Sequence, residues 1–207
     1  MSADYGIFGA MDDANDGVSA VDLLRANELL ARGDYRGAVA LLERLVAEDP
    51  TECAALTALG IAFTEGGEHR KALKALRRSI QLMEEDGDAH EALGCAYFRL
   101  GELENAKRHL SRARELAPED GGVLRNLGVV IDRLGDFEAG ASLIERACAL
   151  NKWDYQAVYA LASVRLRQGE IEAALELLER IASEDSPADL KVLAIDHVHN
   201  LRRYLKA

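Results

Sequence analysis

The histidines are the first residues to examine, because near neutral pH they could act as general bases or bind a metal ion. The sequence contains five, and two of them, His197 and His199, are only two residues apart. On a helix, side chains two residues apart point in different directions, so this pair is not expected to bind one metal ion. His69, His90 and His109 stand at unrelated positions. We therefore assign no catalytic or metal-binding role to any histidine.

The motifs of common active sites are also missing from the sequence. It contains no glycine-rich phosphate loop, no Gly-x-Ser-x-Gly turn and no His-Glu-x-x-His pair. The cysteines, Cys53, Cys95 and Cys148, are odd in number and widely spaced, which is not typical of a disulfide framework or a zinc knuckle. We expect them to be reduced and buried, as in a cytosolic protein. The sequence thus predicts a protein that is not an enzyme and needs no cofactor or metal.

The composition excludes several kinds of partner. The formal net charge is -11 at pH 7, whereas binding to nucleic acid or to anionic lipid requires a basic surface. The first residues are acidic, with no long apolar run after them, so they do not resemble a signal peptide. No stretch approaches the roughly 18 apolar residues that a membrane helix needs. We expect a cytoplasmic protein that binds no nucleic acid and does not insert into membranes.

Three arginines have a spacing that could serve binding: Arg99, Arg133 and Arg167 follow one another at intervals of 34 residues. The same interval separates five glycines, and it separates small residues in two further series. The glycines are Gly33, Gly67, Gly101, Gly135 and Gly169; the small residues are Ala26, Gly60, Gly94, Gly128 and Ala162, then Ala38, Ala72, Ala106, Gly140 and Ala174. A fixed interval of this length in so many positions indicates a repeat protein.

Each repeat reads as two amphipathic helices. Apolar residues recur at helical spacing on both sides of the repeated glycine, for example at Leu93 and Tyr97 before Gly101 and at Ala106 and Leu110 after it. The glycine fits a helix C-terminus that requires a positive φ angle. An acidic residue follows each of these glycines and favours the start of the second helix.

These series resemble the tetratricopeptide-repeat family. The best copy runs from Ala92 through Leu93, Gly94 and Tyr97, and it continues with the Gly101-Glu102 pair, Ala106, Leu110 and Pro118. The resemblance implies an all-α fold, a right-handed α-solenoid of helix-turn-helix repeats. It covers five copies, which we place at 19–52, 53–86, 87–120, 121–154 and 155–186. One departure is Arg165, which stands where earlier copies have Leu29, Phe63, Tyr97 and Ile131; we expect its charge to be paired or to reach solvent.

The two ends differ from the repeats. Residues 1–18 contain four Asp and no Lys or Arg, and we read them as a disordered acidic segment, or else as a segment that docks. Residues 187–207 are expected to form a helix that caps the open end of the solenoid. Its apolar face would comprise Leu190, Leu193, Ala194, His197, Leu201, Tyr204 and Leu205.

In proteins of the tetratricopeptide-repeat family, the first helices of the repeats line a concave groove that commonly binds an extended peptide or a partner helix. Transferred to this sequence, the resemblance implies a partner-binding groove with these residues: Asn27, Ile61, Phe98, Arg99, Arg125, Asn126, Arg133, Tyr159 and Arg167. Its C-terminal half would be locally basic, so an acidic ligand with a few apolar anchors would suit it. The carboxylate clamp of some family members is not expected, because Leu23, Ala58 and Glu91 occupy positions where it needs polar or basic groups.

The sequence therefore predicts an adaptor or assembly scaffold without catalytic activity that binds a segment of a protein partner. Two alternatives stay open: a cytoplasmic chaperone for a secretion or surface-appendage system, and a scaffold that assembles with itself as a homo-oligomer. A further hypothesis makes residues 1–18 an intramolecular plug for a groove that carries Arg99, Arg125, Arg133 and Arg167.

Overall fold

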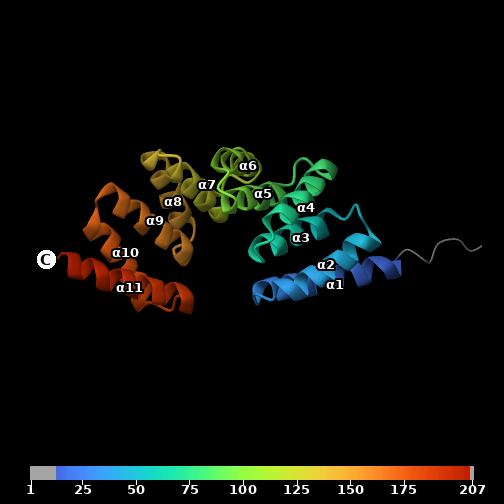
Figure 1. Cartoon of the computed structure of the whole chain (residues 1–207), viewed down its shortest axis with the longest axis horizontal. Helices are drawn as coiled ribbons and strands as arrows, with labels where there is room; N and C mark the ends of the chain where they lie inside the picture. Colours follow the sequence, from blue (N-terminus) through green and yellow to red (C-terminus); the bar gives the residue numbers. More distant parts are fainter. Residues whose placement is uncertain (1–12, 206–207) are drawn as a thin grey trace, which may run out of the picture. The chain divides into compact units, whose positions relative to one another are not determined.

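The computed structural model describes residues 13–205, and all regular structure in that range is helical. Eleven helices follow one another within these residues, which confirms the predicted all-α repeat fold. The chain divides into two compact units, Met1–Glu84 and Glu85–Ala207. Figure 1 labels the helices of both units in chain order.

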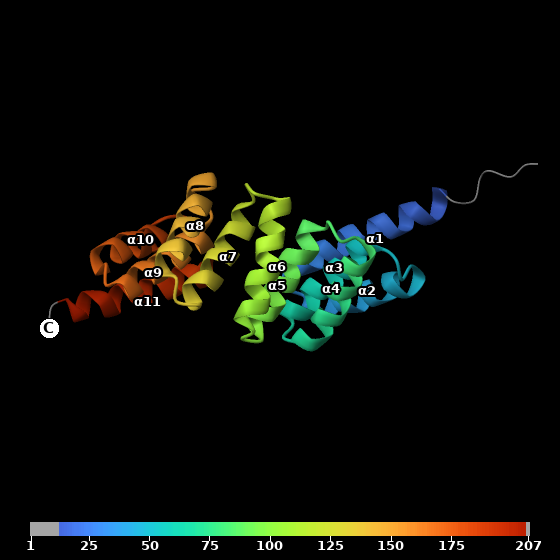
Figure 2. The same cartoon turned by 90° about the horizontal axis from the view of Figure 1, so that it is seen from above.

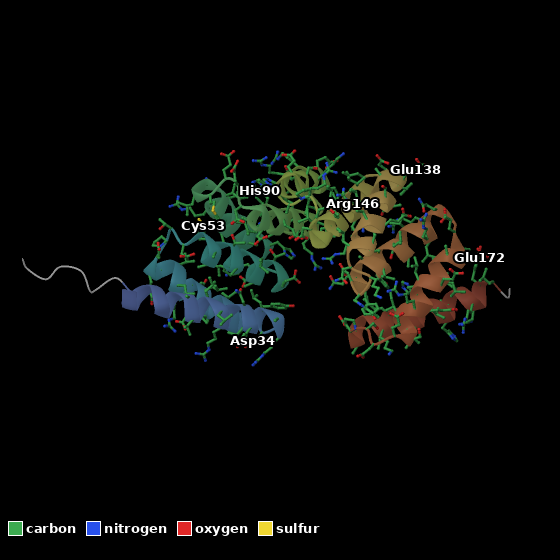
Figure 3. The ribbon with its side chains drawn as sticks, turned by 180° about the vertical axis from the view of Figure 1, so that it is seen from behind. Asp34, Cys53, His90, Glu138, Arg146 and Glu172 are labelled. Atoms are coloured by element: carbon green, nitrogen blue, oxygen red, sulfur yellow. The ribbon has the colours of Figure 1, made fainter. Side chains whose placement is uncertain are left out.

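The first unit contains four helices: α1 (Asp13–Ala31), α2 (Tyr35–Glu48), α3 (Cys53–Glu65) and α4 (His69–Leu82). Helix α2 begins after Asp34, which is labelled in Figure 3. The side chain of Asp34 accepts a hydrogen bond of 2.9 Å from the backbone N–H of Gly37. This cap satisfies one of the N–H groups that the first turn of a helix leaves without a partner. Helix α1 begins at Asp13 and so includes the last residues of the segment 1–18; the rest of that segment, residues 1–12, lies outside the described range.

The second unit contains seven helices. They are α5 (Gly87–Arg99), α6 (Leu103–Leu116), α7 (Gly121–Arg133), α8 (Phe137–Leu150), α9 (Tyr155–Gln168), α10 (Ile171–Ser183) and α11 (Ala188–Tyr204). Helices α5, α7 and α9 start at the first residues of the expected third, fourth and fifth repeats, and each packs against the helix that follows it (Figure 2). In this unit α5, α7 and α9 are thus the helices that the family resemblance assigns to a groove.

The turns between the two helices of a repeat are built on the repeated glycines. All five have positive φ angles, between 75° and 98°, which side chains with a Cβ atom rarely adopt. At the turn of the third repeat, the N–H of Gly101 donates to the carbonyl oxygen of Phe98 (3.0 Å) and the N–H of Glu102 to that of Tyr97 (3.0 Å). These bonds use carbonyl groups that the end of α5 would otherwise leave unsatisfied.

The small residues of the second series allow the two helices of a repeat to approach closely. A Cβ atom at Gly94 would lie 2.6 Å from Cγ of Leu110, and one at Gly128 would lie 2.6 Å from Cγ1 of Ile144. Both Leu110 and Ile144 are fully buried. Dense packing of this kind leaves little room for added atoms.

Helix α11 packs on the end of the fifth repeat. Its buried residues Ala194 and Val198 join a cluster with Val158 of α9 and with Leu178 and Ile181 of α10. The face that the sequence assigned to this contact is only partly right. Of those residues, Ala194 is buried, Leu190, His197 and Leu201 are half-buried, and Leu193, Tyr204 and Leu205 are exposed. The contact lies along the narrow stripe of Ala194 and Val198. The predicted apolar face was broader than this stripe, so its outer residues are exposed to solvent.

Arg165 is paired, as its position in an apolar series led us to expect. Its guanidinium contacts the carboxylates of Glu145 and Glu170, the latter at 3.0 Å, and donates to Oε1 of Gln168 at 3.1 Å.

No helix in residues 13–205 is both long enough and apolar enough to cross a membrane.

Candidate partner-binding site

A pocket of about 200 Å³ opens in the second unit, around α7. We call it the α7 pocket. Its lining comes from α5, α6, α7 and α9 and is mostly apolar, with polar groups at Arg125, Asn126 and Gln156. The full lining is Cys95, Phe98, Leu110, Arg125, Asn126, Val129, Val130, Gln156 and Ala160. A concave apolar surface with a few polar groups is the usual form of a binding site.

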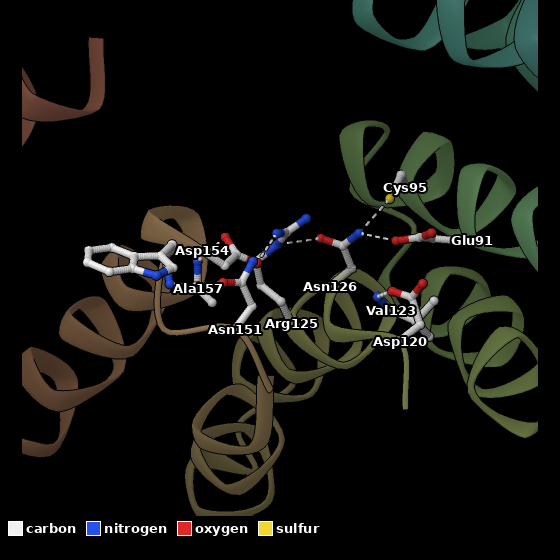
Figure 4. Close-up of polar contacts among 10 residues, drawn as sticks. Glu91, Cys95, Asp120, Val123, Arg125, Asn126, Asn151, Asp154 and Ala157 are labelled. Carbon is white, nitrogen blue, oxygen red and sulfur yellow. Dashed lines mark hydrogen bonds and ion pairs between the residues drawn. The ribbon is translucent and has the colours of Figure 1, made fainter. Parts of the chain in front are cut away.

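A chain of polar contacts crosses the edge of the α7 pocket and links three helices (Figure 4). Arg125 of α7 forms an ion pair of 2.6 Å with Asp154, at the start of α9. Its Nε donates to Oδ1 of Asn126 at 3.4 Å, and Nδ2 of Asn126 donates to Oε1 of Glu91 on α5 at 2.8 Å. The same Nδ2 also lies 3.4 Å from Sγ of Cys95. The side chains at this edge are therefore held in place before any ligand binds.

Helix capping explains why Asp154 is available to Arg125. One oxygen of Asp154, Oδ1, accepts from the backbone N–H of Ala157 at 3.0 Å and caps α9, while the other, Oδ2, faces Arg125. Asp120 caps α7 in the same way, through the N–H of Val123 at 3.0 Å. Both carboxylates are fixed by the backbone of the helix that they cap, so they are rigid charges beside the pocket.

Glu91 is in an unfavourable place for a negative charge. Burial is the first cause that raises its pKa above the ordinary value of 4.5, and the nearby carboxylates of Asp120 and Asp88 add to the shift. The hydrogen bond from Asn126 and the charge of Arg125 oppose it without cancelling it. The protonated form of Glu91 is thus favoured relative to an exposed glutamate.

We expect the substitution Glu91→Gln to stabilise the protein near neutral pH but not in acid. Because the pKa of Glu91 is raised on folding, the folded state binds more protons above pH 4.5, and stability is lost as the pH rises through the folded value. Glutamine keeps the acceptor for Asn126 and does not ionise. Urea unfolding of both proteins at pH 4 and pH 7.5 should show a difference that grows with pH. A difference that is equal at both pH values would contradict this account. Glu138→Gln, on the exposed surface of α8, controls for the loss of one charge.

A second ion pair joins α7 and α9. Nε of Arg167 donates to Oδ1 of Asp132 at 3.3 Å, and a terminal nitrogen of the guanidinium contacts Oδ2 of the same carboxylate. The side chain of Asp132 is 0% exposed, while that of Arg167 is 42% exposed. The two parallel contacts are the bidentate geometry that arginine and carboxylates favour.

The predicted groove residues fall into several environments. Asn27 and Ile61 belong to the first unit, and the other seven to the second. Phe98, Arg125 and Asn126 line the α7 pocket. Arg99 and Arg133 are exposed, and Tyr159 is half-buried, its ring centroid 5.7 Å from that of His197.

The sequence predicted that this half of the groove would be basic, but the structure places carboxylates beside two of its arginines. Arg125 is paired with Asp154 and Arg167 with Asp132, so much of the positive charge is compensated. The prediction of a basic groove counted the arginines and left the carboxylates of Glu91, Asp132 and Asp154 out of account. A signal for two of them was present, because Glu91 and Asn126, and likewise Asp132 and Arg167, are 35 residues apart. Residues one repeat and one position apart can meet across neighbouring first helices.

Nothing in the described range suggests a metal site. Residues 13–205 contain no group of three or more His, Cys, Asp or Glu side chains that could hold an ion. The three cysteines are half-buried thiols rather than fully buried ones, and burial raises the pKa of the Cys148 thiol. A raised pKa makes a thiol less nucleophilic at neutral pH.

The fold and the pocket define a helical-repeat protein with a preformed pocket among α5, α6, α7 and α9. Models of the tetratricopeptide repeat match residues 23–89 and 91–152, and a further model of the same repeat matches residues 133–193. The chain belongs to the tetratricopeptide-repeat family. Proteins of this family bind peptide or protein partners. Comparison with curated proteins gives no match.

Several solved structures share the fold. A thermophilic tetratricopeptide-repeat protein of Thermus thermophilus, TTC0263, is similar with a TM-score of 0.80 and 23% identity, over 87% of this chain and 98% of that one. PilF of Pseudomonas aeruginosa is similar with a TM-score of 0.72 and 20% identity, over 94% of this chain and 93% of PilF. YrrB is described as a tetratricopeptide-repeat protein with an unusual peptide-binding site. It is similar with a TM-score of 0.59 and 19% identity, over 84% of this chain and 90% of YrrB. At these identities the similarity establishes the fold.

Proposed function

We propose that this protein is an adaptor without catalytic activity, acting in the cytoplasm, which binds an extended segment of a protein partner across α5, α7 and α9. The α7 pocket carries this proposal. It takes one apolar side chain of the partner, and the polar chain from Glu91 to Asp154 offers donors and acceptors to the partner's backbone.

The charges beside the pocket narrow the chemistry of the partner. Arg125 and Arg167 already face carboxylates of this chain, whereas Arg133 is exposed one turn beyond Val129 of the pocket. A segment with an apolar anchor in the pocket and a carboxylate near Arg133 satisfies both features. The description of YrrB as having a peptide-binding site is consistent with this use of the fold.

The proposal is tested with a displayed library of random 12-residue peptides, selected on the full chain. The affinity of the selected peptide is then measured by fluorescence anisotropy for the wild type and for Ala160→Phe. Ala160 is half-buried in the lining, so a benzyl group there fills the pocket without adding charge. We expect the variant to bind at least about tenfold more weakly, which is the effect of removing a central anchor of an interface.

Ala173→Phe is the matched control, because Ala173 is exposed on α10 and does not line the α7 pocket. It should bind the selected peptide like the wild type. If Ala160→Phe and Ala173→Phe are both folded and bind the selected peptide with the same affinity, the peptide binds outside the α7 pocket and the proposal is wrong.

A further inference from the structure

Helix α4 concentrates positive charge in an acidic protein. Between His69 and Leu82 it has five Lys or Arg and no Asp or Glu, a charge of +5. The whole chain has a net charge of -11, so the residues outside α4 sum to -16. Solubility depends on net charge, which α4 makes smaller, so solubility does not explain this helix.

The cations of α4 lie on an exposed side of the helix. Arg70, Lys74 and Arg78 follow one another at intervals of four residues, so they share a face and are separated by roughly 6 Å of helix at each step. All three side chains are exposed. A surface hollow of about 470 Å³ lies along this face, and we call its lining the α4 patch. The lining is Arg70, Leu73, Lys74, Arg77, Arg78 and Gln81.

Three of these cations are not neutralised by the protein itself. Lys71, elsewhere on α4, contacts the carboxylate of Glu68. Within residues 13–205, however, no carboxylate pairs with Arg70, Lys74 or Arg78. Their charges therefore face solvent and are available to a ligand.

The positive charge is specific to the second repeat. The position of Arg70 is acidic in the three repeats that follow, with Glu104, Glu138 and Glu172. Arg112, which stands 34 residues after Arg78, contacts Glu85 at 3.8 Å. The residue 34 positions before Glu85 is Thr51, so the second repeat lacks that carboxylate. The repeat fold as such thus requires no basic surface at α4.

The size and surroundings of the α4 patch indicate which kind of anion suits it. From Arg70 to Arg78 the patch covers only roughly 12 Å of helix. A nucleic acid or an anionic lipid surface extends further and would meet the acidic remainder of the chain. The apolar side chains Ala72, Ala75 and Leu76 are buried in the protein, so α4 has no free apolar face to insert into lipid. A short acidic segment of a protein fits within the patch.

We propose that the α4 patch is a docking surface for an acidic helix of a partner protein that carries Asp or Glu at every fourth residue. The carboxylates of such a helix have the same spacing, roughly 6 Å, as Arg70, Lys74 and Arg78. Leu73 in the lining offers an apolar contact to the residues between the carboxylates. The α4 patch belongs to the first unit and the α7 pocket to the second, and the two share no residue.

The proposal is tested with a displayed library of random 15-residue peptides, selected on the full wild-type chain and depleted on a triple variant. The variant combines Arg70→Gln, Lys74→Gln and Arg78→Gln. We expect the remaining peptides to be rich in Asp and Glu four residues apart. In fluorescence anisotropy, the triple variant should bind such a peptide at least about fivefold more weakly, because three exposed ion pairs are lost together. Binding to the wild type should also weaken as salt is added.

The matched control combines Arg32→Gln, Lys107→Gln and Arg203→Gln. These exposed cations lie outside α4, and the control has the same net charge as the first triple variant. It should bind the peptide like the wild type, and so should Ala160→Phe, which separates this proposal from that for the α7 pocket. A library that yields no acidic peptide, or equal affinities of the two triple variants, overturns the proposal.

A single-stranded DNA of about 15 nucleotides and vesicles with about 30% phosphatidylserine test the other kinds of anion. We expect both to bind the wild type more weakly than the selected peptide does. If either binds more tightly, and the first triple variant loses that binding, the α4 patch serves nucleic acid or lipid and the proposal is wrong. Circular dichroism of each variant checks that the fold is retained.

Discussion

Replacing Arg167 with methionine is expected to lower the free energy of unfolding by about 2–4 kcal/mol. The reason is the side chain of Asp132, which is 0% exposed and has two contacts to this guanidinium. Without Arg167 its charge stays buried and uncompensated. This loss is smaller than the roughly 3–5 kcal/mol of a broken fully buried pair, because Arg167 itself is 42% exposed and solvent screens part of the interaction. Urea unfolding of the two proteins measures the loss.

The double variant Asp132→Leu with Arg167→Met separates the pair from its surroundings. It removes both charges, and apolar groups of similar size replace them, so it should be more stable than Arg167→Met alone by at least about 1 kcal/mol. If the single and the double variant lose the same free energy, then the packing of Arg167, and not the buried carboxylate, is what matters.

The substitution Gly128→Ala is expected to cost about 1–3 kcal/mol, although alanine is the better helix former. The added Cβ atom would lie 2.6 Å from Cγ1 of Ile144 and 2.8 Å from the backbone oxygen of Gly140. Ile144 is fully buried, and the Gly140 oxygen belongs to the backbone of α8, so neither can move away without shifting that helix. Thermal and urea unfolding should both show the loss.

Gly121→Ala is the matched control for this prediction. Gly121 is the first residue of α7, and a Cβ atom there would meet only the backbone oxygen of Ala147, at 3.8 Å. That is an ordinary van der Waals distance, so the change should be neutral or slightly stabilising. If both variants are equally stable, α7 and α8 are less tightly packed than the structure shows.

The repeat architecture could be read from the sequence because it depends on few residues at fixed intervals. A glycine at Gly101 or Gly135 is needed for a positive φ angle, and a small residue at Gly94 or Gly128 is needed for close helix contact. Such requirements recur at every repeat, so they appear as a period of 34 in the sequence. The pattern in α11 is weaker, and its buried stripe was only partly assigned.

The chemistry of the pocket could not be read in the same way. Whether Arg125 presents a positive charge depends on Asp154, which lies 29 residues away and owes its position to capping α9. The burial of Asp132 depends on how α7, α8 and α9 pack, and its residue type differs from that of Phe98, which stands 34 positions earlier. The charges of the site thus depend on side chains that occur in one repeat only, and the 34-residue period gives no information about them.

The most direct test of the proposed groove is chemical-shift mapping of the selected peptide on the isotopically labelled protein. We expect the largest changes on the lining of the α7 pocket, at Cys95, Phe98, Asn126, Val129 and Gln156, with smaller ones near Arg133. Changes that concentrate instead on the exposed surfaces of α6, α8 and α10 would show that the peptide binds outside the α7 pocket, and the proposed binding site would be wrong.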